Sequence, residues 1–207
     1  MHRKEFLLIC FWLTWALAGG CAARRLPPPP ATVTMQPGNF VEDCFFAPGF
    51  IPTQGSYALG PIKVENSRGV APETFVPLFL AEFKRAWEDN GLRLSDDKPD
   101  CRLTLTLHHL AVDSGRFRFL TGKISASLTA SGVITVKDQV LFAFWDRLSL
   151  NSPVSPGPPA PKETELLLRR ISRELAHHLL NELLLHGLTA DDTNRSAKTR
   201  NSSRGRF

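Results

Sequence analysis

Three side chains that can bind metal ions recur at every fourth position near the end of the sequence: His178, Glu182 and His186. In a helix this spacing places all three on one face, where imidazole nitrogens and a carboxylate could share a zinc ion. The two histidines are two turns apart, however, whereas the familiar helical zinc pair is one turn apart. The alternative is a polar flank of an amphipathic helix near its C-terminus, where histidine is electrostatically favoured. This alternative is preferred, and we expect no metal and no other cofactor.

Other residue patterns in the sequence give even weaker evidence of catalysis than this one. His108 and His109 are neighbours on a predicted strand, so their side chains would point to opposite faces and could not chelate one ion. The sequence contains no nucleophile elbow, glycine-rich phosphate loop or Cys-x-x-Cys pair. We therefore expect no catalytic residues and no enzyme, and an enzyme that uses the face of His178 is the weakest of three functional classes.

Basic and aromatic side chains alternate in the segment 113–123, which connects two predicted strands. Cations can contact anionic phosphates while apolar rings insert into an apolar surface. We predict that residues 115–123 form a projecting arm that contacts a lipid or a partner protein. The alternative is an ordinary hairpin, in which the rings complete the core and the arginines are solvated. The candidate lipid-binding or partner-binding residues are Arg116, Phe117, Arg118, Phe119 and Lys123.

Residues 1–20 are typical of an export signal peptide. Arg3 and Lys4 provide a basic start, and the apolar run that follows has about 13 residues, too few to span a bilayer. The segment Leu17–Cys21 resembles the lipobox of bacterial lipoproteins, whose cysteine is diacylated and becomes the mature N-terminus. The resemblance implies that Cys21 is the lipidation site. The alternative is an ordinary signal peptide in which Cys21 has no special role.

A proline-rich spacer and an irregular lead-in follow Cys21, so residues 21–54 are expected to link the lipid to the domain. The four consecutive prolines Pro27–Pro30 favour an extended chain. Cys10 leaves with the signal peptide, which leaves Cys44 and Cys101 in an oxidising compartment. Two alternatives remain open for them: a disulfide, or two buried free thiols.

The stretch Cys101–Leu150 predicts three consecutive strands with hairpin connections at 113–123 and 137–139. In Ile124–Lys137 the even positions are apolar or small and the odd positions are mostly polar. Such alternation is typical of a strand with one buried face and one solvated face. The first of the three strands alternates leucine with polar residues in the same way, so neighbouring strands agree about the buried side.

Two amphipathic helices are predicted. The first is capped by Thr74, has Pro77 in its first turn and ends at Asn90-Gly91. Its aromatic residues are spaced as in a helix face that covers a sheet. The second spans Thr164–His186 and is expected to stop at Gly187. The aromatic positions of the first helix are Phe75, Phe79, Phe83 and Trp87.

These elements, with a strand at Tyr57–Glu65, predict an α+β domain over residues 55–187. We expect a four-stranded antiparallel or mixed sheet with two helices on one face. Residues 188–207 are expected to be a disordered basic tail. The tail and the signal region hold most of the formal net charge of +5. The body is therefore nearly neutral, and we expect no nucleic-acid partner.

The order strand, helix, three strands, helix, together with the lipobox, is most similar to the lipopolysaccharide-assembly lipoproteins of the LptE family. This resemblance implies a non-catalytic, lipid-anchored protein of the outer membrane that faces the periplasm. It also implies a barrel partner and contact with lipopolysaccharide through Arg116, Arg118 and Lys123. The alternative function is an auxiliary lipoprotein adaptor of an ABC-type lipid or solute transport system. Such an adaptor would bury a sheet edge or helix face against a soluble subunit of the transport complex.

Overall fold

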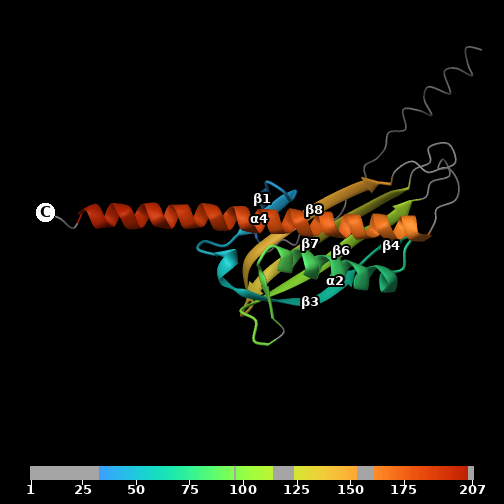
Figure 1. Cartoon of the computed structure of the whole chain (residues 1–207), viewed down its shortest axis with the longest axis horizontal. Helices are drawn as coiled ribbons and strands as arrows, with labels where there is room; N and C mark the ends of the chain where they lie inside the picture. Colours follow the sequence, from blue (N-terminus) through green and yellow to red (C-terminus); the bar gives the residue numbers. More distant parts are fainter. Residues whose placement is uncertain (1–32, 96, 114–123, 153–160, 205–207) are drawn as a thin grey trace, which may run out of the picture. The chain divides into compact units, whose positions relative to one another are not determined.

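A computed structural model of the protein describes residues 33–95, 97–113, 124–152 and 161–204 (Figure 1). Side chains of the last helix are described from Lys162 to Thr189. The helices are η1 (Pro52–Gln54), a 3-10 turn, α2 (Pro72–Asp89) and α4 (Pro161–Arg204). The strands are β1 (Gln36–Pro37), β2 (Asp43–Phe46), β3 (Ser56–Val64), β4 (Ser67–Arg68), β5 (Arg93–Leu94), β6 (Cys101–Asp113), β7 (Ser125–Val136) and β8 (Gln139–Asn151).

The strands form one mixed sheet in the order β1-β2-β8-β7-β6-β3-β5, and β4 pairs separately with β6. The three long strands β6, β7 and β8 form the predicted antiparallel meander, and β3 lies parallel to β6. The α+β class is confirmed, but the sheet described here has eight strands and not four. The additional strands contain two to four residues each, too few to show an alternating pattern.

The meander places its apolar side chains on one face, as its alternation predicts. Leu103, Leu105 and Leu107 of β6 are at most 2% exposed. The register is irregular after Leu107, so that Leu110 also faces the core although it lies three positions later. The shift leaves His108 at the irregular position of the strand, where the strict alternation of side chains does not apply.

The hairpin between β7 and β8 lies where the sequence predicts it. Its two connecting residues, Lys137 and Asp138, have φ angles of 44° and 67°. Positive φ at both positions is characteristic of the two-residue turn whose twist matches that of the flanking strands. Beside the turn Val136 pairs with Gln139 and Thr135 with Val140, and after one register shift Ile134 pairs with Phe142.

Helix α2 buries the aromatic face that the sequence predicts. Phe75, Phe79, Phe83 and Trp87 are completely buried, with centroid distances of 5.3–5.7 Å between consecutive rings. The helix begins earlier than expected: Ala71 is the N-cap and Pro72 occupies the first turn. Pro72 suits that position because its missing N–H has no partner there in any helix. Pro77 consequently lies inside the helix and not in its first turn.

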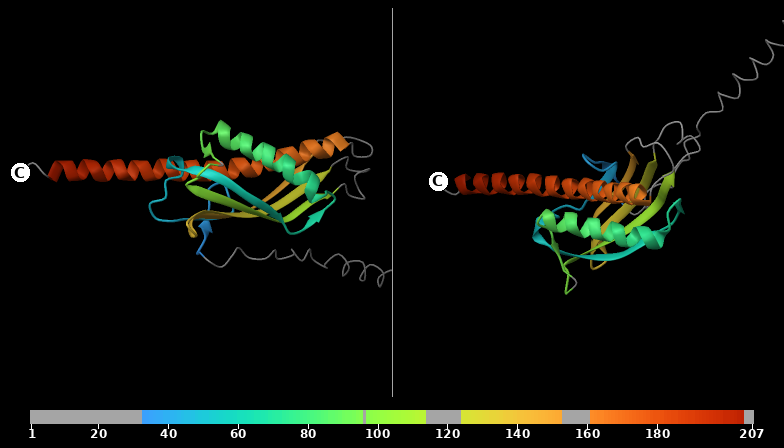
Figure 2. Two further views of the ribbon diagram at one scale, coloured as in Figure 1. Left: turned by 90° about the horizontal axis from the view of Figure 1, so that it is seen from below. Right: turned by 45° about the vertical axis from the view of Figure 1, so that its right-hand side comes forward.

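Helix α4 does not stop at Gly187 but continues to Arg204, through residues expected to be a disordered tail. A single glycine weakens a helix by about 1 kcal/mol relative to alanine and does not by itself end one. Helices α2 and α4 lie side by side on one face of the sheet (Figure 2). No helix among the described residues is both long and apolar enough to cross a membrane.

Candidate functional site

Glu182 of α4 carries a carboxylate that is buried, with the residue only 3% exposed. Its Oε2 accepts hydrogen bonds from the backbone N–H groups of Asn39 at 2.8 Å, Phe40 at 2.7 Å and Val41 at 3.4 Å. Its Oε1 accepts from the Asn39 side-chain amide at 3.2 Å and from the Cys44 thiol at 3.8 Å. Successive backbone N–H groups that converge in this way form an anion site. We call this arrangement, made by residues 39–41, Cys44 and Glu182, the Glu182 clasp.

Gly38 allows the loop to approach the carboxylate closely. A Cβ atom at position 38 would lie 2.7 Å from the Val41 carbonyl oxygen and 3.1 Å from Oε2 of Glu182. Real Cβ atoms essentially never come as near to a backbone oxygen as the first of these distances. Any side chain at position 38 would therefore push the loop away from the carboxylate. The clasp thus joins the segment between β1 and β2 to α4.

The Cys44 thiol is held in its protonated form by the same environment. Burial, together with the neighbouring Glu182 carboxylate, raises the pKa of Cys44 to about 12. A thiol with this pKa carries almost no thiolate at neutral pH, so it is not a nucleophile. It acts here as a small buried donor to Glu182.

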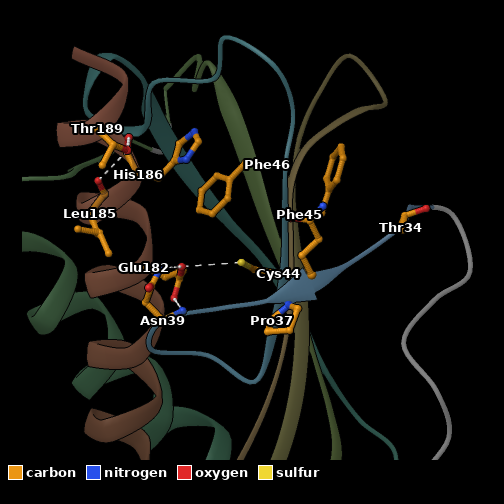
Figure 3. A pocket seen from close by; sticks show the side chains of 11 residues that line it. Thr34, Pro37, Asn39, Cys44, Phe45, Phe46, Glu182, Leu185, His186 and Thr189 are labelled. Atoms are coloured by element: carbon orange, nitrogen blue, oxygen red, sulfur yellow. Dashed lines mark hydrogen bonds between the residues drawn. The ribbon is translucent and has the colours of Figure 1, made fainter. Parts of the chain in front are cut away.

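A cavity of about 590 Å³ opens beside the clasp (Figure 3). One side is formed by β1, β2 and the residues around them, and the other side by α4. The side chains that line it are aromatic, aliphatic or uncharged, apart from Glu182 and His186. They are Thr34, Gln36, Pro37, Asn39, Cys44, Phe45, Phe46, Glu182, Leu185, His186 and Thr189.

His186 contributes an apolar surface to this cavity. Its ring stacks on Phe46, with a centroid distance of 3.8 Å and an interplanar angle of 10°. Burial lowers the pKa of His186, against the opposing effects of a hydrogen bond to the Phe50 backbone and of the Glu182 charge. The lowered pKa favours the neutral form of the ring, whose face continues the aromatic surface of Phe46.

The three side chains spaced as metal ligands in α4 have three separate partners. His178 lies with Nδ1 2.8 Å from Oδ2 of Asp146 in β8. Burial raises the pKa of Asp146, an effect that the hydrogen bond and charge of His178 oppose. Glu182 belongs to the clasp and His186 stacks on Phe46, and no group of three metal-binding residues occurs in the described part of the chain.

The structure also corrects the preferred interpretation of His178, Glu182 and His186 as a polar flank near the C-terminus of an amphipathic helix. Glu182 points into the core, and His186 lies well before the end of the helix. Glu182 adjoins Leu179 and Leu183 in the buried stripe. A carboxylate inside an apolar helical stripe is the sequence signal for the clasp, and sequence reasoning missed it.

A second polar cluster lies on the sheet face opposite the helices. His108 has Nδ1 2.8 Å from Oε2 of Glu65 and Nε2 2.7 Å from Oγ of Ser131. The ring of Trp145 packs on His108 at 4.7 Å. This serine–histidine–carboxylate order is that of a nucleophile with its base.

The surroundings of Ser131 differ from those of a catalytic serine. Ser131 lies in the middle of β7, paired with Thr106 of β6 on one side and Trp145 of β8 on the other. A catalytic serine needs free N–H groups for the oxyanion, whereas backbone groups within a sheet are used by the neighbouring strands. The cavities beside Glu182, Leu94 and Arg85 do not include Ser131. We interpret the cluster as a polar network that orients the bulged segment of β6.

The remaining residues predicted as sites do not come together in the described regions. Cys21 and the arm residues Arg116, Phe117, Arg118, Phe119 and Lys123 lie outside them. Of the two alternatives left open for Cys44 and Cys101, the structure has two free, buried cysteines and not a disulfide. Strands β8 and β7 lie between β2 and β6, so the axes of β2 and β6 are about 14 Å apart across the sheet. The register adds an offset along the strands, because the residue of β6 in line with Cys44 is Leu105 and not Cys101. A disulfide requires Cα atoms within about 7 Å.

No protein-family model matches the sequence, and no curated protein matches it. Among solved structures, a Xanthomonas campestris protein of the DUF330 family matches with 11% identity and a TM-score of 0.48, over 74% of this chain and 93% of that one. Rare lipoprotein B from Shewanella oneidensis matches with 12% identity and a TM-score of 0.42, over 63% and 98%. A minor lipoprotein from Acinetobacter baumannii matches with 14% identity and a TM-score of 0.40, over 62% and 91%.

Proposed function

We propose that this protein is a non-catalytic lipoprotein of the bacterial cell envelope, anchored through Cys21, that assists the assembly or transport of outer-membrane lipid, with lipopolysaccharide as the first candidate. The observation that carries the proposal is the Glu182 clasp. It attaches the segment that follows the predicted lipid anchor to α4, beside a cavity lined by both apolar and polar side chains. In this proposal the chain that follows the anchor is attached to the domain at residues 39–41.

We propose a role without a reaction centre because of the surroundings of two polar clusters, the one at Ser131 and the one on α4. The Ser131 cluster lies on a strand whose backbone groups are used in the sheet. The candidates for metal ligands in α4 are each paired elsewhere. A binding and positioning role requires neither a nucleophile nor a metal.

The anchor is tested by metabolic labelling with a fatty acid. Label should enter the wild-type protein and should be missing from Cys21→Ala, because thiol acylation needs that cysteine. The control is Cys44→Ala, which should be labelled like the wild type. Equal labelling of the wild type and Cys21→Ala would reject the anchor and, with it, the envelope role.

A second candidate function is an adaptor of an ABC-type transport system. The observation that favours it is the exposure of two leucines of α4, Leu166 at 58% and Leu188 at 67%. A photocrosslinker at Phe117 should capture a membrane barrel if the arm enters one. A crosslinker at Leu188 should instead capture a soluble periplasmic subunit if the adaptor reading is correct. Crosslinks from Leu188 alone would favour the adaptor over the assembly role.

A further inference from the structure

We infer that the outer edge of β3 binds a second copy of this chain, by antiparallel pairing about a two-fold axis at Val64. The inference goes beyond the proposed function and does not depend on it. Three observations support it: the backbone groups that β3 presents at its edge, the order of the charges along the strand, and the apolar flank of α2 beside it.

Most of the outer edge of β3 has no neighbouring strand among the described residues. Strand β5 pairs only with Ser56 and Tyr57, at the start of β3, and β6 pairs along the other side. Beyond Tyr57, β3 therefore forms one margin of the sheet (Figure 1). An open strand edge presents N–H and C=O groups that can pair with another strand.

The hydrogen bond from the Glu65 N–H to the Leu107 carbonyl oxygen, 2.9 Å long, shows which backbone groups of β3 point outward. Val64 is the residue in register with Leu107. In a parallel ladder the residues on either side of Val64 therefore bond to β6, and Val64 directs both of its groups outward. Ile62, two positions earlier, does the same. No other described residue donates to or accepts from these outward groups of Ile62 and Val64.

The order of charges about Val64 is self-complementary. Within one copy, Nζ of Lys63 lies 2.9 Å from Oε1 of Glu65, and the two side chains are 70% and 30% exposed. An axis at Val64 places Lys63 of each copy opposite Glu65 of the other, so that four alternating charges meet. An axis at Lys63 would instead oppose two lysines. An axis nearer the start of β3 would bring the irregularity between Leu59 and Ile62 into the paired run.

The flank of α2 on the side of this edge is partly apolar. Lys84 and Glu88 line a cavity of about 160 Å³ together with Leu59 of β3, so their side of the helix faces the edge. Val76 and Leu80 continue the same row at intervals of four residues, and both are only partly buried. Because a two-fold interface uses the same surface of both copies, this row would meet its counterpart beside the paired strands.

The position of the axis is tested by a cysteine substitution in the full chain. Hydrogen-bonded residues that face each other in an antiparallel pair have Cα atoms about 5.5 Å apart, a distance that suits a disulfide. Val64→Cys should therefore link two copies under mild oxidation, and mass spectrometry should identify the linked peptide. Ile62→Cys is the matched control, because the two copies of this position would be about 13 Å apart along the strands. The wild type, in which Cys44 and Cys101 are buried, should not form the link.

An exchange of charges tests the register independently. Lys63→Glu should weaken dimerisation about tenfold in sedimentation velocity, because it opposes like charges at two symmetric positions. The double variant Lys63→Glu with Glu65→Lys should restore dimerisation, because opposite charges face each other again. Arg102→Glu is the control, since Arg102 is an exposed cation of the neighbouring strand β6 and does not lie at the edge. Circular dichroism checks that each variant is folded.

A folded full chain that stays monomeric up to millimolar concentration would overturn the inference. So would a disulfide in Ile62→Cys as abundant as that in Val64→Cys, because the axis would then lie elsewhere. Capture of a different protein by Val64→Cys, without the linked dimer, would reject a second copy and assign the edge to a strand of that protein. If Val64→Cys does not fold, Lys63→Cys and Glu65→Cys in two separately tagged chains replace it. A mixed disulfide should then join the two chains, and its absence would reject the axis.

Discussion

Glu182 places a carboxylate among the apolar side chains of α4, where it is stabilised by hydrogen bonds from the backbone N–H groups of residues 39–41. Burying an unpaired carboxylate is costly, and a shape-matched apolar residue would instead leave the donors of residues 39–41 unsatisfied. We predict that Glu182→Leu lowers the free energy of unfolding by about 2–4 kcal/mol. Urea denaturation followed by circular dichroism measures this value.

Glu88→Leu is the control, because Glu88 is an exposed glutamate of α2 that undergoes the same chemical change. Its effect should stay within about 0.5 kcal/mol. Equal losses in the two variants would show that the clasp contributes nothing specific.

Glu82 of α2 is a second buried carboxylate that is stabilised by partners from another segment, here two arginines of α4. The residue is 7% exposed, and its carboxylate lies 3.1 Å from Arg169 and 2.8 Å from Arg173. Burial alone would raise the pKa of Glu82, but the hydrogen bonds and charges of the two arginines outweigh it and hold the pKa below the ordinary value of 4.5. The folded state therefore binds this proton less readily than the unfolded state does.

A depressed carboxyl pKa stabilises the fold fully above about pH 4.5, and this stabilisation is lost as the pH falls through the lower folded value. We predict that Glu82→Gln lowers the free energy of unfolding by about 1–2 kcal/mol at pH 7, a value reduced because both arginines are partly solvated. The difference from the wild type should shrink below pH 4.5. Denaturation at pH 7, 5 and 3.5 checks this, with Glu88→Gln as the control. A difference that is constant over this range would contradict the assignment.

At the scale of elements, the packing of β7 against its neighbours depends on Gly132. A Cβ atom there would lie 2.5 Å from Cε1 of Phe144 and 2.7 Å from Cδ2 of Leu105. We predict that Gly132→Ala lowers the free energy of unfolding by about 1–3 kcal/mol, because the core must shift to admit the methyl group. Thermal and urea unfolding measure the loss.

Gly55→Ala is the matched control for this substitution. Position 55 has φ of −109°, and the nearest atom to a new Cβ would be Sγ of Cys101 at 3.6 Å, an ordinary contact. This variant should be unchanged or more stable by up to about 1 kcal/mol. Similar losses in both variants would mean that backbone freedom, and not crowding, determines the effect at Gly132.

At the scale of the whole molecule, the strand order makes a prediction about the cysteines. Cys44 and Cys101 lie on strands separated by β8 and β7, so neither can reach the other in the native fold. We predict that both thiols react fully with iodoacetamide in denaturant without reductant, and slowly in the native protein. Mass spectrometry counts the alkyl groups. Two additional reactive thiols that appear only after reduction would reject this sheet order.

The sequence by itself determined the long, regular elements. Apolar and polar residues alternate over many positions in β6, β7 and β8, and aromatic residues recur at every fourth position in α2. Only a strand in the first case and a helix in the second would bury all these apolar side chains on one face. The hairpin at Lys137 and Asp138 followed from the meeting of two such runs. The short strands could not be predicted, because two to four residues carry no period and depend on a neighbouring strand for their hydrogen bonds.

Tertiary structure alone decided the candidate site. The spacing of His178, Glu182 and His186 put them on one helical face, but spacing does not reveal what packs against that face. Asp146, the loop at residues 39–41 and Phe46 come from distant parts of the chain and divide the three side chains among separate partners. The question of a disulfide stayed open for the same reason, since the number of cysteines is read from the sequence whereas their separation is set by the strand order. Contacts between segments far apart in the sequence therefore decided that Glu182 belongs to the clasp and not to a set of metal ligands.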